Sequence, residues 1–190
     1  MTKNKHISIK IEATHIFDAF ILTPGVIVDN RGFFFESWNE KTFQEVVGLE
    51  TSFVQDNHSR SKRGVLRGLH YQLHFPQGKL VRVIQGRVFD VAVDLRESSP
   101  TFGKYVGVEL SDENHKQLWI PPGCAHGFFV QSESADFVYK TTDYYKSDDE
   151  YCIRWDDPDL NINWRLDNIT PQLSAKDSKG QAFQDAPKYY

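Results

Sequence analysis

The sequence predicts an all-β fold, an antiparallel sandwich or barrel, and three observations support this prediction. Short segments in which apolar and polar residues alternate recur through most of the 190-residue chain. Glycine and proline turns separate these segments, and only one stretch has the spacing of a helix. Alternation buries one face of each segment, and many short strands of this kind are typical of sandwiches and barrels.

The expected strands follow one another from the N-terminus to Thr141. In chain order they are Ile7–Ile11, Phe33–Trp38, Val65–Gln72, Leu80–Ile84, Val88–Leu95, Tyr105–Leu110, Leu118–Ile120, Phe128–Val130 and Phe137–Thr141. Turns are expected between them at Gly78, at Gly86, around Pro100 and at Pro121–Gly123. These segments predict a core of strands over about residues 20–150.

One helix is expected between Asn39 and Gly48. Asn39 is a suitable N-cap, because its side chain can accept a hydrogen bond from the first turn. Phe43, Val46 and Val47 form an apolar stripe at helical spacing, and Gly48 can end the helix in a left-handed conformation. This stretch therefore predicts one short helix packed on the sheets.

The alternation is lost after about residue 151, where tryptophan, proline and aspartate replace it. We therefore expect a C-terminal appendage over residues 151–190, made of loops and short helical turns on the outside of a sheet. Its last few residues are expected to be mobile. The whole chain, residues 1–190, is interpreted as a single domain.

The charged residues are balanced, with 22 Lys and Arg against 26 Asp and Glu. Non-specific nucleic-acid binding depends on clustered positive charge, so this balance argues against a nucleic-acid partner.

No apolar run approaches the ~20 residues of a membrane span, and Met1–His6 does not lead into the apolar core of a signal peptide. Because Cys124 and Cys152 cannot build a disulfide framework, we expect a cytoplasmic protein.

The strand Val88–Leu95 separates two kinds of residue. Its odd-numbered positions are all apolar, whereas its even-numbered positions include Asp90 and Asp94. In a sheet washed by solvent, the acidic face has no functional meaning, but in a closed sandwich it would line a polar cavity. From this strand alone, we interpret the acidic face as one exposed to solvent.

His70 lies on the expected strand Val65–Gln72, and a regular strand points Arg67 to the opposite face. If both residues serve one pocket, Gly68 marks a bulge between them. Cationic and aromatic residues together favour an anionic, ring-bearing ligand. The cationic candidates are Arg31, Arg67, Lys79 and Lys176, and the aromatic ones are Tyr139, Tyr144 and Tyr145.

A metal site made of His70, His74 and His126 is an alternative, because small β-barrels often hold a metal on histidines. His70 and His74 share strand parity and could therefore point the same way. The neighbouring cations Lys79 and Arg67 would repel a metal ion, so this hypothesis of a metal-dependent dioxygenase is the weaker one.

Ordered sequence blocks recur over roughly Phe20–Asp177, namely Arg31–Glu36, Phe53–Ser59, Val65–Gln72, Gln77–Arg82, Phe89–Arg96, Ser99–Gly103, Gln117–Pro121, Ala125–Phe128, Tyr139–Tyr145 and Leu173–Asp177. In this order the blocks resemble the dTDP-4-dehydrorhamnose 3,5-epimerase family. The resemblance implies a cupin-type jelly roll, a homodimer, and catalysis without a metal or organic cofactor. It also implies epimerisation of dTDP-4-dehydro-6-deoxy-D-glucose at C3 and C5, on the path to dTDP-L-rhamnose for cell-surface polysaccharide.

The resemblance implies roles for individual residues. His70 would be the catalytic base, Tyr139 the opposing acid, Asp177 the group that orients the imidazole, and Lys79 the stabiliser of the enolate. The positions that match substrate-binding ones are Arg31, Glu36, Gln55, Asp56, Asn57, Arg67, His126, Glu150 and Lys176, and Tyr145 matches the residue that stacks on thymine.

Two further hypotheses stay open beside the 3,5-epimerase and the dioxygenase. One is an enzyme of the same scaffold that epimerises C3 or C5 alone, or that uses another 4-keto nucleotide sugar. The other is a sugar-binding sandwich without catalytic activity. The common motifs do not separate the first of these from the 3,5-epimerase.

Overall fold

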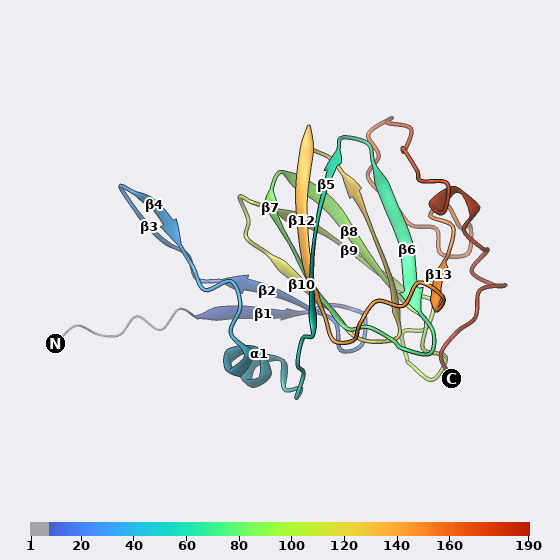
Figure 1. Cartoon of the computed structure of the whole chain (residues 1–190), viewed down its shortest axis with the longest axis horizontal. Coiled ribbons are helices and arrows are strands. Elements are labelled where there is room, and N and C mark those ends of the chain that lie inside the picture. The colour runs from blue at the N-terminus through green and yellow to red at the C-terminus, as the bar shows by residue number, and fades with distance from the viewer. Residues whose placement is uncertain (1–7) are drawn as a thin grey trace.

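The computed structural model describes residues 8–190 and contains two antiparallel β-sheets that face one another (Figure 1). In spatial order, the six-stranded sheet contains β1 (Ile9–Ala13), β2 (Phe20–Pro24), β10 (Gln117–Ile120), β7 (Lys79–Gln85), β12 (Ser134–Thr141) and β5 (Gln55–Lys62). The five-stranded sheet contains β13 (Glu150–Cys152), β6 (Leu66–Gln72), β11 (Cys124–Val130), β8 (Arg87–Asp94) and β9 (Tyr105–Ser111). The predicted antiparallel all-β fold is confirmed, as an open sandwich.

The third sheet is a small hairpin of β3 (Ile27–Asp29) and β4 (Gly32–Phe34), which projects away from the sandwich (Figure 1). Here the expected strand Phe33–Trp38 is wrong beyond Phe34, because the chain leaves the hairpin and runs irregularly to the helix. The first expected strand begins at Ile9 in β1, and Ile7 lies outside the described residues, as does Met1–His6.

Strand β5 is the clearest strand that the sequence analysis missed. Its sequence is almost entirely polar, yet its residues alternate between exposed and less exposed positions along the strand. Periodicity of hydrophobic residues does not detect such a strand, since both of its faces are polar. β2, β3 and β13 were missed as well. β6 to β10 match the expected strands with small changes at their ends, whereas β11 begins at Cys124 instead of Phe128 and β12 at Ser134 instead of Phe137.

Helix α1 (Glu40–Val47) forms as the sequence predicts. The Asn39 side chain accepts a hydrogen bond from the backbone N–H of Thr42 at 3.1 Å. Gly48 adopts φ 74°, the left-handed conformation that ends the helix. Phe43 and Val47 are buried against Trp119 of β10, so the helix covers the outer face of the six-stranded sheet.

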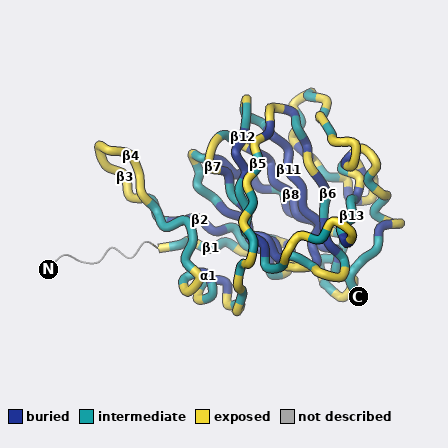
Figure 2. The backbone as a smooth tube through the Cα atoms, in the orientation of Figure 1, coloured by how far each residue is buried: buried dark blue, intermediate teal, exposed yellow. Residues whose placement is uncertain are grey.

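Strands β8 and β11 of the five-stranded sheet are buried along most of their length (Figure 2). Two apolar layers lie on the two faces of this sheet. One fills the sandwich between the sheets and includes Val81, Leu118 and Phe137. The other includes Val91 and Trp164 and lies between the five-stranded sheet and the C-terminal residues. The expected appendage therefore covers the outside of a sheet, and it contains the short helical turn η1 (Asp177–Lys179).

The last residues are anchored, so the expectation that they are mobile is wrong. The backbone N–H of Tyr189 donates to the carbonyl oxygen of Leu95 at 3.1 Å, and the N–H of Glu97 donates to the carbonyl of Tyr189 at 2.8 Å. The hydroxyl of Tyr71 donates to the carbonyl of Pro187 at 2.6 Å. Within residues 8–190, no helix has the length and apolar character that a membrane span requires.

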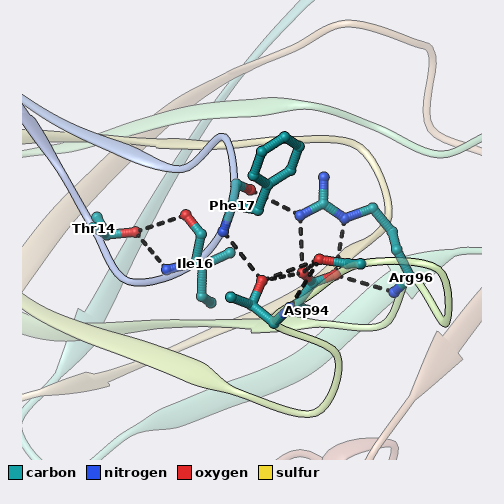
Figure 3. Close-up of polar contacts among 7 residues, drawn as sticks. Thr14, Ile16, Phe17, Asp94 and Arg96 are labelled. Carbon is teal, nitrogen blue, oxygen red and sulfur yellow. Dashed lines mark hydrogen bonds and ion pairs between the residues drawn. The ribbon is translucent and has the colours of Figure 1, made fainter.

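Asp94 lies at the end of β8 and is fully buried. The prediction that the acidic face of this strand is exposed to solvent is therefore wrong at Asp94. Its carboxylate accepts hydrogen bonds from the Arg96 guanidinium at 2.8 and 2.9 Å, from Ser99 at 2.6 Å and from Thr101 at 2.7 Å. Arg96 also donates to the carbonyl of Phe17, which joins this turn to the β1–β2 connection (Figure 3). These contacts give Asp94 a structural role in joining the turn after β8 to the β1–β2 connection.

Candidate active site

A cleft opens between the two sheets at the end that carries β13. Its inner part has a volume of about 290 Å³ and its outer part about 430 Å³, and the two parts share several lining residues. The inner part is lined by residues of both sheets, including Asn57, Arg67, His70, Lys79, His126 and Tyr139. Gln55, Lys176 and Asp177 line the outer part.

His70 forms the centre of a hydrogen-bonded group at this cleft. Its Nε2 lies 2.6 Å from Oδ1 of Asp177, which also accepts from the backbone N–H of Gly68 at 3.2 Å. The other carboxylate oxygen accepts from the Ser174 hydroxyl at 2.7 Å. Burial opposes ionisation of Asp177, but these hydrogen bonds outweigh it and lower the pKa of Asp177 to about 2. The carboxylate is therefore ionised and holds the imidazole in place.

A β-bulge brings Arg67 and His70 into the same cleft, as the sequence analysis required. The register between β11 and β6 shifts between His126 and Phe128, opposite this segment. Gly68 has φ 107°, and a Cβ built on it would lie 2.5 Å from the carbonyl oxygen of His126. Only glycine fits this close approach of the two strands.

Tyr139 reaches the cleft from β12, so it lies on the sheet opposite His70. Burial, with a contribution from Glu150, raises the pKa of its phenol. Tyr139 therefore keeps its proton at neutral pH. The cleft thus combines an imidazole from one sheet with a protonated phenol from the other.

Lys79 lies at the start of β7 with its side chain in the inner cleft. Burial lowers the pKa of its ammonium group to about 8, against the opposing effect of Glu150 and Asp90. His126 lies within hydrogen-bond distance of Asp90, with 2.9 Å between Nε2 and Oδ2. Burial lowers the pKa of His126, which is therefore neutral at pH 7.

Asp90 is fully buried behind His126. The prediction that the acidic face of β8 is exposed to solvent is therefore wrong at Asp90 as well. The alternation in Val88–Leu95 was the signal, since it placed Asp90 on the face opposite the apolar residues. Sequence reasoning also missed Ser174, which holds Asp177, and Gln77, which lines both parts of the cleft.

Glu150 of β13 joins several residues at the mouth of the cleft. It accepts a hydrogen bond from the Tyr145 hydroxyl at 2.6 Å and forms an ion pair with Lys176. Burial opposes ionisation of Glu150, but these two partners outweigh it and lower its pKa. The side chain of Gln55 accepts from the backbone N–H of Tyr145 at 3.0 Å and donates to Asn57 at 2.9 Å.

Three of the expected binding residues do not reach this cleft. Arg31 lies in the turn of the projecting hairpin, where it is exposed and paired with Asp29 at 2.6 Å. Glu36 accepts a hydrogen bond from the helix cap Asn39 instead. Asp56 points to the outer face of β5 and pairs with Lys140 at 2.9 Å.

The histidine trio of the metal hypothesis is not assembled either. His70 and His126 both line the inner cleft. His74 lies at the surface, where its Nδ1 is 2.7 Å from Asp149. Tyr144 is exposed too and is not among the residues that line the cleft.

Comparison with known proteins gives one family over most of the chain. The family model described as dTDP-4-dehydrorhamnose 3,5-epimerase matches residues 13–185. The dTDP-4-dehydrorhamnose 3,5-epimerase of Pseudomonas aeruginosa is 60% identical over 169 residues, which are 89% of this chain and 93% of the relative.

Solved structures of related enzymes agree with this family. The dTDP-6-deoxy-D-glucose-3,5-epimerase of Legionella pneumophila, crystallised with dTDP-4-keto-L-rhamnose, has a TM-score of 0.93 at 50% identity, over 96% of this chain and 99% of that one. A 3'-monoepimerase from Streptomyces bikiniensis in complex with dTDP-quinovose has a TM-score of 0.84 at 31% identity, over 89% and 85% of the two chains. The sandwich described above is therefore the cupin-like jelly roll of these epimerases.

Proposed function

This chain belongs to the dTDP-4-dehydrorhamnose 3,5-epimerase family, and from that premise we propose that it is itself a 3,5-epimerase. It converts dTDP-4-dehydro-6-deoxy-D-glucose to dTDP-4-dehydro-β-L-rhamnose, a step toward dTDP-L-rhamnose and cell-surface polysaccharide. The observation that carries the proposal for its mechanism is the placement of His70 and Tyr139 on opposite sheets of one cleft.

The C4 ketone of the substrate acidifies the hydrogens on C3 and C5. When a base removes one of these protons, the electron pair of the C–H bond delocalises into the carbonyl and forms an enolate. We assign the base to Nδ1 of His70, because Nε2 is committed to Asp177. Asp177 orients the ring and stabilises the imidazolium that forms.

The proton must return to the opposite face of the sugar ring for the configuration to invert. Tyr139 supplies it, because its phenol is protonated and faces the cleft from the opposite sheet. The Lys79 ammonium stabilises the negative charge on O4, which develops only as the enolate forms. Both epimerisations consist of proton transfers alone, so this mechanism requires no metal or organic cofactor.

The remaining cleft residues hold the nucleotide and the sugar. Tyr145 stacks on the thymine ring, and the cations Arg67 and Lys176 bind the pyrophosphate. The polar groups assigned to the sugar and nucleoside are Gln55, Asn57, His126 and Glu150. Binding of the remote nucleotide positions a reactive sugar that offers few contacts of its own. Since the appendage contributes Lys176 and Asp177, we treat residues 1–190 as one catalytic domain.

A homodimer belongs to this proposal, and the projecting hairpin supports it. Val28, Phe33 and Phe34 are more than half exposed there, and a two-stranded hairpin is marginally stable in water alone. A partner subunit would cover this apolar surface. Arg31 and Glu36, which do not reach their own cleft, would then contribute to the partner's cleft. Light scattering should give twice the mass of one chain, and a monomeric mass would contradict this part of the proposal.

The expected location is the cytoplasm, which is a further part of the proposal. Both cysteines are free thiols, which suits a reducing compartment. Cell fractionation tests it directly, since the protein should co-purify with a cytoplasmic marker enzyme.

Exchange of substrate hydrogens in D₂O tests the reaction. With the 4-keto sugar nucleotide as substrate, NMR should show deuterium at both C3 and C5 of the product. Deuterium at one carbon alone would make the protein a monoepimerase, and no deuterium at either carbon would exclude an epimerase.

The variant Tyr139→Phe tests the assignment of the two faces. Without the phenol, net epimerisation should be lost while His70 still removes protons, so deuterium exchange should outlast product formation. Equal loss of exchange and product would contradict the separate roles of the two residues.

A further inference from the structure

The wall behind the His70 imidazole contains a thiol that the proposed reaction does not use. Cys152 of β13 is the cross-strand partner of His70 in β6, and directly paired residues project to the same face of a sheet. Asp177 lies against the same side of the imidazole, at Nε2. One ligand atom each from His70, Cys152 and Asp177 lies within 4.8 Å of the other two.

These three side chains form a mixed nitrogen, sulfur and oxygen set. Such a set suits Zn²⁺, which binds imidazole and carboxylate at about 2.0–2.2 Å and thiolate at about 2.3 Å. A tetrahedral ion separates its ligand atoms by about 3.5 Å, so small side-chain adjustments would close the site. The fourth position would face the outer cleft, which His70 and Asp177 line, and water would occupy it.

We propose that His70, Cys152 and Asp177 form a binding site for a thiophilic divalent cation of the Zn²⁺ type, and that the bound ion inhibits the enzyme. The inhibitory part rests on the proposed function, whereas the binding part does not. This ion is not a cofactor, because it occupies the nitrogen that Asp177 otherwise holds.

The charges balance in the bound state. The thiol of Cys152 loses its proton to water, and the imidazole keeps its single proton by moving it from Nε2 to Nδ1. The ion therefore carries one thiolate, one carboxylate and one neutral imidazole, with no net charge in a half-buried wall. Neutrality matters here because an unpaired charge in such a place is costly.

Neighbouring charges do not prevent this binding. Arg67, whose charge counts against a metal at His70, donates to the Ser61 hydroxyl at 3.0 and 3.1 Å. Lys176 is the nearby cation on the mouth side, and its ion pair with Glu150 compensates it. Lys79 lies in the inner cleft, where Glu150 and Asp90 oppose its charge.

Inhibition follows from the position of the proton. Nδ1 is the atom assigned to remove protons from the sugar. With the ion on Nε2 and a proton on Nδ1, the imidazole has no free electron pair toward the cleft. The enzyme can then hold substrate but cannot start the reaction.

Titration with Co²⁺ tests binding without any activity measurement. In the metal-free wild-type protein, Co²⁺ should bind with a stoichiometry of one and give the near-ultraviolet band of a cobalt–thiolate bond. Cys152→Ala should abolish the band. Cys124→Ala, which removes the other thiol of the chain, should keep it, and so should His74→Ala at the surface pair with Asp149.

Zn²⁺ inhibition is then compared within each variant, relative to that variant's own rate without metal. One equivalent of Zn²⁺ should lower wild-type turnover by about tenfold or more, reversibly with a chelator, and should leave Cys152→Ala unchanged. A cobalt–thiolate band that persists in Cys152→Ala, or the lack of any band in the wild type, would overturn the site. A bound ion with unchanged turnover would overturn the inhibition.

Discussion

Asp94 and Asp177 are two buried carboxylates in similar surroundings but with different consequences. Each accepts several hydrogen bonds that outweigh burial and lower its pKa. The partners of Asp94 are Arg96, Ser99 and Thr101 in the turn after β8, and none of them lines the cleft. One partner of Asp177 is His70, whose other ring nitrogen faces a cleft. A lowered pKa by itself therefore does not distinguish the two carboxylates, and the titratable partner at the cleft is what makes Asp177 the proposed functional one.

The largest expected change is the loss of turnover in His70→Ala, the variant that removes the partner of Asp177. Removal of the proposed general base should lower turnover by about 10³-fold or more, while binding of dTDP and the thermal midpoint change little. Steady-state kinetics, nucleotide binding and thermal unfolding measure the three quantities. His74→Ala is the matched control, since its surface pair with Asp149 lies apart from the cleft, and its turnover should stay at the wild-type level.

Asp94→Ala should lower stability and leave turnover nearly unchanged, which is the reverse of His70→Ala. It leaves Arg96 and two hydroxyl donors without their buried acceptor, so the free energy of unfolding should fall by about 3 kcal/mol. Urea denaturation measures this loss, and turnover per folded molecule should remain close to normal. If turnover fell while stability held, the structural role of Asp94 would be wrong.

Asp177→Asn tests whether the charge of the cleft carboxylate, and not its shape, matters for turnover. The amide keeps the shape of the side chain but loses the charge that stabilises the imidazolium, so turnover should fall on the order of 10²-fold. Folding lowers the pKa of Asp177 from 3.8 to about 2, so its contribution to stability is lost as pH falls through this range. The free energy of unfolding, measured in urea between about pH 2 and about pH 5, should therefore depend less on pH in Asp177→Asn than in the wild type.

The smallest expected change is in the pH dependence of turnover, and it concerns Lys79. Its pKa of about 8 lies below the usual value for lysine, so the ammonium group loses its proton as pH rises through about 8. Turnover should therefore fall about tenfold between pH about 7 and about 9. Arginine stays charged over this range, so Lys79→Arg should lose this alkaline decline even if its rate is lower at every pH. A decline that persists in Lys79→Arg belongs to another group.

Local signals in the sequence were sufficient for several elements. Helix α1 was predictable from its cap, its apolar stripe and its final glycine, because these act within a few residues of one another. The bulge at Gly68 followed from the requirement that Arg67 and His70 serve one pocket. β5 was not predictable from periodicity, since its cleft-facing side chains are as polar as its outer ones.

Alternation and motif order are properties of the chain, so the amino-acid sequence was enough to predict an antiparallel sandwich or barrel, the family and the residue types of the cleft. The choice of an open sandwich, and which of these residues come into contact, depended on the folded structure. It buried Asp90 behind His126, brought Asp177 across 107 positions to His70, and left Arg31 on a hairpin outside its own cleft. The physical reason is that contacts between distant segments depend on how the sheets face and where the strands bulge, which no local pattern encodes.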